Sequence, residues 1–409
     1  MLQKVPAHRV ATQKLILLQS DGTPAAGDVH IEMTRHAFLF GCGAFDALPL
    51  TQPQTSDADR ARYADRLEKW LALFNFGTLP FYWGRFEPER GKPHTEDLMN
   101  AAQWLVEQNV TVKGHPLCWH TVCADWLMEL SNEEILKTQL ARIHRDVAGF
   151  AGVIDMWDVI NEVVIMPIFD KYDNGITRIC KELGRVGMIR EVFAAAREAN
   201  PGSTLLLNDF NTGIDYEILI DGCLNAGIPI DAIGIQSHQH QGYWGLEKLH
   251  AVLDRFAHFG LPIHFTENTL ISGDLMPAHI EDLNDWQVPV WPTTPEGEAR
   301  QAREISEMYT VLFEHPLVEA ITTWDHTDGN WLGAPSGVLR ADGSTKPAHD
   351  ALHRLIHQDW WTDLTAAADA GGGVSFTGVK GEYRVTAGRE SATFTLDSGD
   401  GGPLTMRLS

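Results

Sequence analysis

The sequence is poor in basic residues. It holds 32 Lys and Arg against 55 Asp and Glu, which gives a formal net charge of −23 over 409 residues. A surface field of this sign repels nucleic-acid phosphates and anionic lipid head groups. We therefore expect neither nucleic acid nor a membrane surface as a partner, whereas an uncharged polysaccharide would be unaffected by the field.

Cysteines are also few, and long apolar runs are missing. The cysteines are odd in number and form no CxxC pair, so neither a disulfide framework nor a zinc knuckle is indicated, and we expect free, buried thiols. No run of 18 consecutive apolar residues occurs, and residues 1–18 lack the apolar core of a signal peptide. We expect a soluble protein. It would be cytoplasmic, or secreted or periplasmic if a signal peptide was removed. The sequence indicates no oligomeric state. The cysteines are Cys42, Cys118, Cys123, Cys180 and Cys223.

Between about residues 36 and 360, short apolar runs alternate with longer amphipathic stretches, the pattern of repeated βα units. One of these stretches, residues 131–150, opens with a sequence resembling a capping box, and another spans residues 187–199. Eight strands are predicted, and eight parallel strands close a (β/α)8 TIM barrel. The predicted strands are residues 38–45, 74–80, 111–119, 155–162, 204–210, 232–240, 262–268 and 320–328.

The two chain ends follow a different pattern. Residues 9–34 predict a β-hairpin with its turn at residues 21–24, and four short strands are predicted after residue 373. The Ala- and Gly-rich residues 366–373 resemble a linker. Because each piece is too small to be stable alone, we expect residues 1–35 to pack on residues 361–409 in one small accessory β-sandwich with a structural role, beside a barrel of residues 36–360.

Polar residues end six consecutive predicted strands. Active sites of TIM barrels are built at the C-terminal ends of the strands, so these residues would meet at one mouth. Accidental helix caps could explain any single position, but not six strands in a row. From the third strand to the eighth, the ends read GHPLCWH (114–120), WDVINE (157–162), LNDFN (207–211), GIQSHQH (234–240), FTEN (265–268) and WDHTD (324–328).

Two of these strand ends supply glutamates. Cleavage of a glycosidic bond needs one protonated carboxyl to assist the leaving oxygen and a second carboxylate at the anomeric carbon. Glu162 ends the fourth predicted strand and Glu267 the seventh, so the pair would face each other across a substrate. We predict Glu162 as the acid/base and Glu267 as the nucleophile.

The neighbours of the pair suit this chemistry. Asn161 can bond a sugar 2-hydroxyl, although a capping amide is the alternative, and His238 can hold Glu267 ionised, although a structural histidine is the alternative. Tryptophans near the strand ends offer faces for sugar rings, although any one of them can equally be core. They are Trp83, Trp119, Trp324 and Trp331, with Trp286 and Trp291 in the long segment after the seventh strand.

A metal site would use some of the same residues. His238 and His240 face the same way on a strand and would need His115 or Asp328 as another ligand. No HExxH or EF-hand spacing supports such a site, and the first strand lacks the HxH pair of metal-dependent amidohydrolases. We expect neither a metal nor another cofactor.

The strand ends resemble glycoside hydrolase family 10, the retaining endo-1,4-β-xylanase family, over residues 36–355. WDVINE resembles the acid/base motif, and the interval between Glu162 and Glu267 is similar to the family's, at 267 − 162 = 105 residues. The resemblance implies an eight-stranded barrel with these two catalytic glutamates. It also implies contacts to the sugar nearest the cleaved bond from His115, Trp119, Asn161, Asn208, Gln236, His238, Trp324 and Trp331.

Two positions depart from the family pattern. The second strand usually ends in a Glu-Asn pair with a lysine before tryptophan, whereas residues 78–83 read TLPFYW, and Asn268 to Leu270 replace the usual leucine and aspartate. We expect cleavage of β-1,4-xylosidic bonds in xylan or xylo-oligosaccharides, with a related decorated, short or aryl β-glycoside as an alternative substrate. Two different functions compete with this one: a non-catalytic carbohydrate-binding barrel and a metal-dependent hydrolase barrel.

Overall fold

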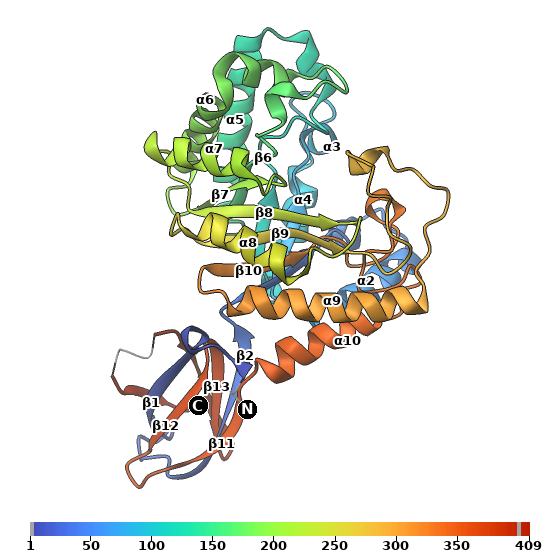
Figure 1. The fold of residues 1–409 in the computed structure, drawn as a ribbon. Coiled ribbons are helices and arrows are strands. Elements are labelled where there is room, and N and C mark those ends of the chain that lie inside the picture. Colours follow the sequence, from blue (N-terminus) through green and yellow to red (C-terminus); the bar gives the residue numbers. More distant parts are fainter. Residues whose placement is uncertain (1–3, 399–401) are drawn as a thin grey trace. The chain divides into compact units, whose positions relative to one another are not determined.

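A computed structural model describes residues 4–398 and 402–409 (Figure 1). The chain divides into two compact units. One unit runs from Phe40 to Ala348, and the other combines the residues up to Leu39 with His349–Ser409. The predicted barrel covers residues 36–360, whereas residues 349–360 group with the terminal strands.

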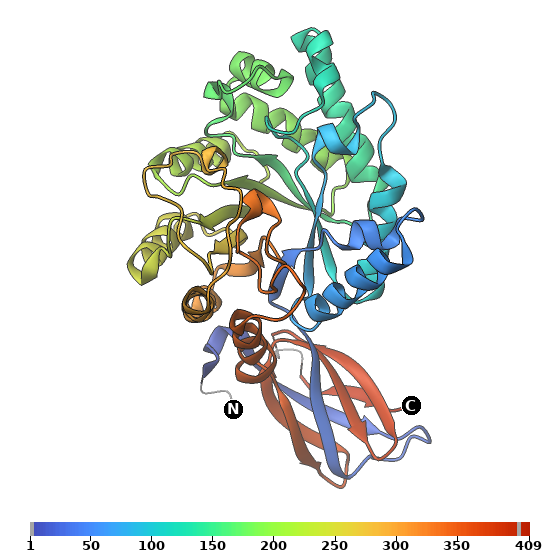
Figure 2. The same cartoon turned by 90° about the vertical axis from the view of Figure 1, so that its right-hand side faces the viewer.

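The larger unit is a closed barrel of eight parallel strands in the order β10-β3-β4-β5-β6-β7-β8-β9. Helices surround it, as Figure 2 shows. The strands are almost continuously buried because they are covered on both faces. This is the predicted TIM barrel. Its strands are β3 (Leu39–Gly43), β4 (Phe76–Pro80), β5 (Thr111–His115), β6 (Met156–Asn161), β7 (Thr204–Asp209), β8 (Ala232–Gln239), β9 (Ile263–Leu270) and β10 (Val318–Thr323).

Two strands end well before their predicted ends. β5 ends at His115 and β10 at Thr323, so Trp119 and Trp324 lie in the loops that follow these strands. Leu117 to Trp119 extend the apolar run past β5, whereas only Trp324 does so after β10, where residues 325–328 are polar. The consequence is that both indole rings belong to the loops at the barrel mouth.

The helices alternate with the strands. α5 begins with a complete capping box between Ser131 and Glu134, as predicted. The helix predicted for residues 187–199 is the second part of α6, which is interrupted by a positive φ of 70° at Gly184. In the described residues, no helix is long and apolar enough to span a membrane. The helices are α1 (Ala47–Thr51), α2 (Asp57–Leu71), α3 (Trp83–Phe86), α4 (Thr95–Glu107), α5 (Asn132–Gly149), α6 (Gly175–Ala199), α7 (Ile214–Asn225), α8 (Gly245–Ala257), α9 (Pro295–Glu314) and α10 (Pro347–Arg354).

The smaller unit contains two sheets, in the orders β12-β1-β15 and β11-β2-β13-β14. Both chain ends contribute strands to both sheets, as expected for the accessory sandwich. Alternate residues such as Leu15, Ile31 and Tyr383 are fully buried in a common apolar core. The strands are β1 (Val10–Leu18), β2 (Gly27–His36), β11 (Asp363–Ala368), β12 (Gly373–Val379), β13 (Gly381–Ala387), β14 (Glu390–Leu396) and β15 (Leu404–Arg407).

Two predictions for the chain ends are wrong. β1 and β2 do not form a hairpin: β1 pairs with β12 and β15, and β2 pairs with β11 and β13. Each strand has one apolar face, and the two faces bury each other better across a core than side by side in one sheet. Residues 366–368, predicted as linker, belong to β11, where Ala368 is buried.

Candidate active site

The two predicted glutamates are joined by a chain of amides at the mouth of the barrel. The Asn208 Nδ2 atom, at the end of β7, donates to Glu267 Oε1 at 2.8 Å and to Asn161 Oδ1 at 2.7 Å. Asn161 Nδ2 and Gln236 Nε2 both lie 3.2 Å from Glu162 Oε1 and donate to it. Side chains from β6, β7, β8 and β9 therefore converge on one hydrogen-bonded cluster.

Glu162 stands directly after β6 in an unusual backbone conformation. Its φ is 56°, in the left-handed region that a non-glycine residue adopts at a cost, and such positions gather at functional sites. Trp119 Nε1 donates to Glu162 Oε2 at 2.9 Å. Burial raises the pKa of Glu162 to about 8; the Trp119 bond opposes the shift, and the charges of Glu267 and Asp209 add to it. Glu162 therefore holds a proton at neutral pH.

Glu267 lies within β9 in the opposite electrostatic environment. His238 Nε2 lies 3.1 Å from its Oε2, and His115 Nε2 lies 3.9 Å from its Oε1. Burial on its own would raise the pKa of this carboxyl, but the charge of His115 and the hydrogen bond from His238 outweigh it and lower the pKa. Glu267 is therefore ionised where Glu162 is protonated.

A buried ion pair below the mouth orients His115. Lys113 Nζ lies 2.6 Å from Asp158 Oδ2, and the same oxygen lies 2.7 Å from His115 Nδ1. Burial opposes ionisation of Asp158, yet Lys113 and His115 together lower its pKa. This pair was not predicted from the sequence, although a lysine within an otherwise buried barrel strand was a usable signal.

Aromatic rings surround the cluster on one side. Trp324 packs edge-on against His115, with ring centroids 5.3 Å apart, and Trp331 lies 4.4 Å from the ring of His238. Tyr82, which follows β4, lies 5.8 Å from His115 and 5.6 Å from Trp119. A residue from the divergent second strand end therefore reaches the site itself.

Tyr82 is close enough to the carboxylates to be affected by them. Burial raises its pKa well above the ordinary value, and the charges of Glu267 and Glu162 add to the shift. Residues 78–83 depart from the family pattern, and Tyr82 was not among the residues predicted to contact the sugar. Trp83 proves to be structural, since it is buried and its Nε1 donates to Glu87 Oε2 at 3.2 Å.

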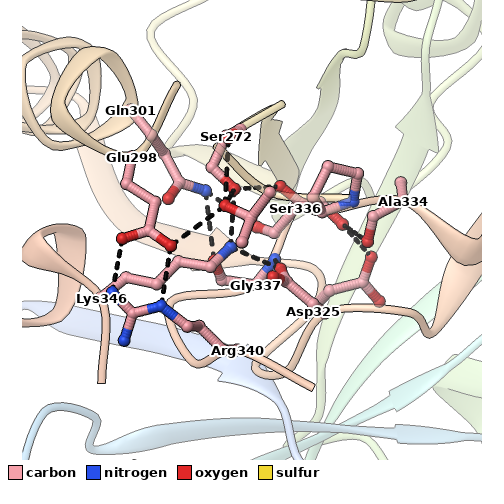
Figure 3. A network of polar contacts seen from close by, with 12 residues as sticks. Ser272, Glu298, Gln301, Asp325, Ala334, Ser336, Gly337, Arg340 and Lys346 are labelled. Carbon is pink, nitrogen blue, oxygen red and sulfur yellow. Dashed lines mark hydrogen bonds and ion pairs between the residues drawn. The ribbon is translucent and has the colours of Figure 1, made fainter. Parts of the chain in front are cut away.

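The loop that carries Trp331 is fixed by a polar network (Figure 3). Buried Lys346 donates to Ser272 Oγ and to the Gly337 carbonyl, both at 2.8 Å, and pairs with Asp328. Ser336 Oγ donates at 2.6 Å to Oδ2 of Asp325, the residue that follows Trp324. These bonds hold the segment after β10 against the segment after β9.

All ten predicted site residues lie at this mouth. The residues considered for a metal have other partners: Asp328 pairs with Lys346, and His238 with Glu267. Among residues 4–398 and 402–409, no group of three or more His, Cys, Asp and Glu side chains is arranged to hold a metal ion. Trp291, one of the two tryptophans in the long segment after β9, bonds within that segment: its Nε1 donates to the Asp274 carbonyl at 2.8 Å.

The family model described as glycosyl hydrolase family 10 matches residues 81–354, which include both glutamates. The chain belongs to glycosyl hydrolase family 10. As a member of this family, the protein is a glycoside hydrolase, which confirms the prediction of an enzyme. Its TIM barrel is the predicted fold.

Similar proteins span different lengths of this family 10 chain. It is 28% identical over 294 residues to endo-1,4-beta-xylanase B of Thermotoga neapolitana, covering 68% of this chain and 78% of the relative. It is 22% identical over 385 residues to an anti-sigma-I factor of Acetivibrio thermocellus, covering 91% of this chain but only 45% of that longer protein. A solved structure of xylanase 10B from Thermotoga petrophila RKU-1 in complex with xylobiose has a TM-score of 0.63 at 21% identity, covering 79% of this chain and 94% of the other.

Proposed function

We propose that this protein cleaves β-1,4-xylosidic bonds in xylan or xylo-oligosaccharides with retention, using Glu162 as the acid/base and Glu267 as the nucleophile. The observation that carries the proposal is the contrast between the two carboxyls. Glu267 is held by two imidazoles and an amide, whereas Glu162 receives only neutral donors and lies near other negative charges. One environment favours a carboxylate and the other a carboxylic acid.

In the first step, a Glu267 carboxylate oxygen attacks the anomeric carbon of the donor sugar while the bond from that carbon to the glycosidic oxygen breaks. Glu162 gives its proton to the departing oxygen, so the leaving chain departs as an alcohol. A covalent ester between Glu267 and the donor sugar results. Asn161 bonds the 2-hydroxyl of that sugar, an interaction that strengthens in the transition state.

In the second step, Glu162 takes a proton from a water molecule whose oxygen attacks the same carbon, and the Glu267 ester oxygen leaves as a carboxylate. The change of role follows from the electrostatics. The charge of Glu267 helps to raise the pKa of Glu162, and esterification removes that charge. The pKa of Glu162 therefore falls in the intermediate, which makes Glu162 a base at the moment when one is needed.

The remaining predicted residues position the donor sugar. His115 and His238 orient the nucleophile, Asn208 and Gln236 align the two glutamates, and Trp119 fixes the acid. We assign the faces of Trp324 and Trp331 to stacking with the sugar ring. The side chains that we assign to the donor sugar are amides, imidazoles and indoles, which suit hydrogen bonding and stacking with a neutral β-linked glycan.

The test is to follow the hydrolysis of xylo-oligosaccharides by proton NMR. Retention predicts that the newly formed reducing end appears first as the β anomer, and first appearance of the α anomer would rule out double displacement. Glu267→Ala should lose at least about 10⁴-fold in kcat, because the covalent route is removed. A variant as active as the wild type would show that Glu267 is not the nucleophile. A wild-type protein that binds xylo-oligosaccharides without turnover would favour a carbohydrate-binding barrel instead of an enzyme.

A further inference from the structure

The segment between β9 and α9, residues 271–294, crosses the mouth of the barrel. We call it the β9 strap. It contains the short 3-10 helix η5 (Leu283–Asp285) and appears as the golden loop at the upper right of the barrel in Figure 1. It directly follows Asn268 to Leu270, which depart from the family pattern, and it contains Trp286 and Trp291.

The first part of the β9 strap is attached to the end of the neighbouring strand, β8. The Met276 backbone N–H donates to the His240 carbonyl at 2.9 Å. Gln241 Nε2 donates to the carbonyls of Pro277 and Ile280 at 3.0 and 2.7 Å. The strap therefore does not hang free beside β9 but lies over the end of β8.

The far part of the β9 strap is attached to the loop that follows Glu162. Lys171 Nζ lies 2.7 Å from Asp282 Oδ2 and 2.7 Å from Asp285 Oδ1. Lys171 belongs to the loop between β6 and α6. Since β7 and β8 separate β6 from β9 in the barrel, the ion pairs connect two loops on different sides of the mouth, in front of β7 and β8.

The geometry of the reaction shows which part of a substrate meets the β9 strap. The general acid of a glycosidase protonates the leaving oxygen, and Glu162 directly follows β6. The rings of Tyr82 and Trp324, in the segments after β4 and β10, pack against His115, which neighbours Glu267. The leaving chain would extend past β6 and β7, toward the bridge made by Lys171.

We propose that the β9 strap restricts the leaving part of the substrate to a short group. The inference rests on the proposed function and refines it: the preferred substrates are short oligosaccharides and small β-glycosides, and a long chain is accepted only after Lys171 releases the strap. Lys171, Asp282 and Asp285 side chains are 41%, 35% and 64% exposed. Ion pairs this exposed are weak and are screened by salt, so the closure is reversible.

The test compares kcat/KM for xylohexaose with kcat/KM for nitrophenyl β-xylobioside, whose leaving group is a single ring. Lys171→Met should raise the ratio of kcat/KM for xylohexaose to kcat/KM for the aryl glycoside by about 5-fold. Lys171→Arg should keep the wild-type ratio, because both ion pairs persist. In the wild type, 1 M NaCl should raise the ratio as the substitution does, and in Lys171→Met salt should have no further effect. The salt series also serves if the variant folds poorly.

The matched control is Lys69→Met, which removes another lysine paired to an aspartate, Asp65 at 2.6 Å, in α2. It should keep the wild-type ratio. A ratio unchanged by both Lys171→Met and salt would overturn the inference, as would a wild type that cleaves xylohexaose as efficiently as the aryl glycoside.

A failure of the proposed function gives a separate signal, namely no turnover of either substrate by any form. In that case calorimetric binding tests the β9 strap without catalysis. Wild-type protein should bind xylohexaose no more tightly than xylobiose, and Lys171→Met should bind xylohexaose about 5-fold more tightly than wild type does. Equal affinities of the two forms for xylohexaose, or no binding by either, would overturn the inference.

Discussion

The core of the terminal sandwich and the mouth of the barrel are both buried, but the first is packed with apolar side chains and the second with polar ones. The described sandwich core is mainly hydrophobic, with Leu15 and Ile31 at 0% exposure. The mouth buries Asn208, Gln236 and Glu267, each at most 4% exposed. Apolar burial stabilises the first region directly, whereas the second must satisfy every polar group to avoid a large desolvation cost. Substitutions should therefore affect folding in one region and chemistry in the other.

The sharpest test of this contrast in the mouth is Asn208→Ala. The variant loses the donor shared by Asn161 and Glu267, so both catalytic side chains lose alignment. We expect kcat/KM to fall by about 100- to 1,000-fold, as when a preorganised donor is removed from other active sites, while the chain still folds. Steady-state kinetics with nitrophenyl β-xylobioside measures the change in kcat/KM. The control is Asn225→Ala, at an exposed position of α7. A fall of less than 3-fold would mean that the amide chain does not organise the site.

In the sandwich, the corresponding change is Ile31→Ala. Removing a fully buried side chain should lower the free energy of unfolding of this unit by about 2–5 kcal/mol without changing kcat. Denaturant unfolding followed by circular dichroism reports the first quantity and initial rates report the second. Leu404→Ala, 39% exposed in β15, should have little effect on either. A large loss of kcat in folded Ile31→Ala protein would contradict the claim that the sandwich affects folding and the mouth affects chemistry.

A smaller effect is expected at Tyr82, where the mouth departs from its family. Tyr82→Phe keeps the ring packing against His115 and Trp119 but removes the hydroxyl near both glutamates. We expect this hydroxyl to bond the donor sugar, and loss of one hydrogen bond corresponds to roughly a 5-fold decrease in kcat/KM. The measurement uses xylobiosides, with Tyr63→Phe on α2 as control. Unchanged kinetics would show that only the ring matters.

The smallest expected effect concerns the stability cost of the mouth. Because the folded-state pKa of Glu162 is raised to about 8, its contribution to stability is fully present below the unfolded pKa near 4.5 and is lost as the pH rises through 8. Glu162→Gln should therefore raise the melting temperature by roughly 2 °C at pH 9 and leave it unchanged at pH 4. Scanning calorimetry at the two pH values tests this, with Glu314→Gln as control. A lower melting temperature at pH 9 would contradict the sign.

The sequence predicted the barrel and its site better than the chain ends, for physical reasons. Apolar runs and polar strand ends are local signals, and the topology of a parallel barrel then brings Asn161, Asn208 and Glu267 together without further information. The hairpin prediction failed because an apolar face does not specify which strand lies beside it. β1 and β2 share a core, yet each pairs with strands from the other end of the chain.

Other features depend on contacts that no local pattern records. The ion pair between Lys113 and Asp158 joins neighbouring strands, and only its buried lysine was visible in the sequence. Lys171 is one of several charged residues in its loop, and nothing nearby indicates that Asp282 and Asp285 lie opposite it. Such pairings follow from how long loops fold back over the barrel.

The central claim, that Glu267 attacks the sugar while Glu162 handles the proton, is tested most directly by trapping the covalent intermediate. A 2-deoxy-2-fluoro-β-xylobioside with an activated leaving group slows both steps, and the good leaving group lets the first proceed. Mass spectrometry of the digested protein should find the fluorinated sugar on the peptide that contains Glu267, and no label in Glu267→Ala. A label on a different carboxyl, or none in protein that hydrolyses xylobiosides, would contradict the account.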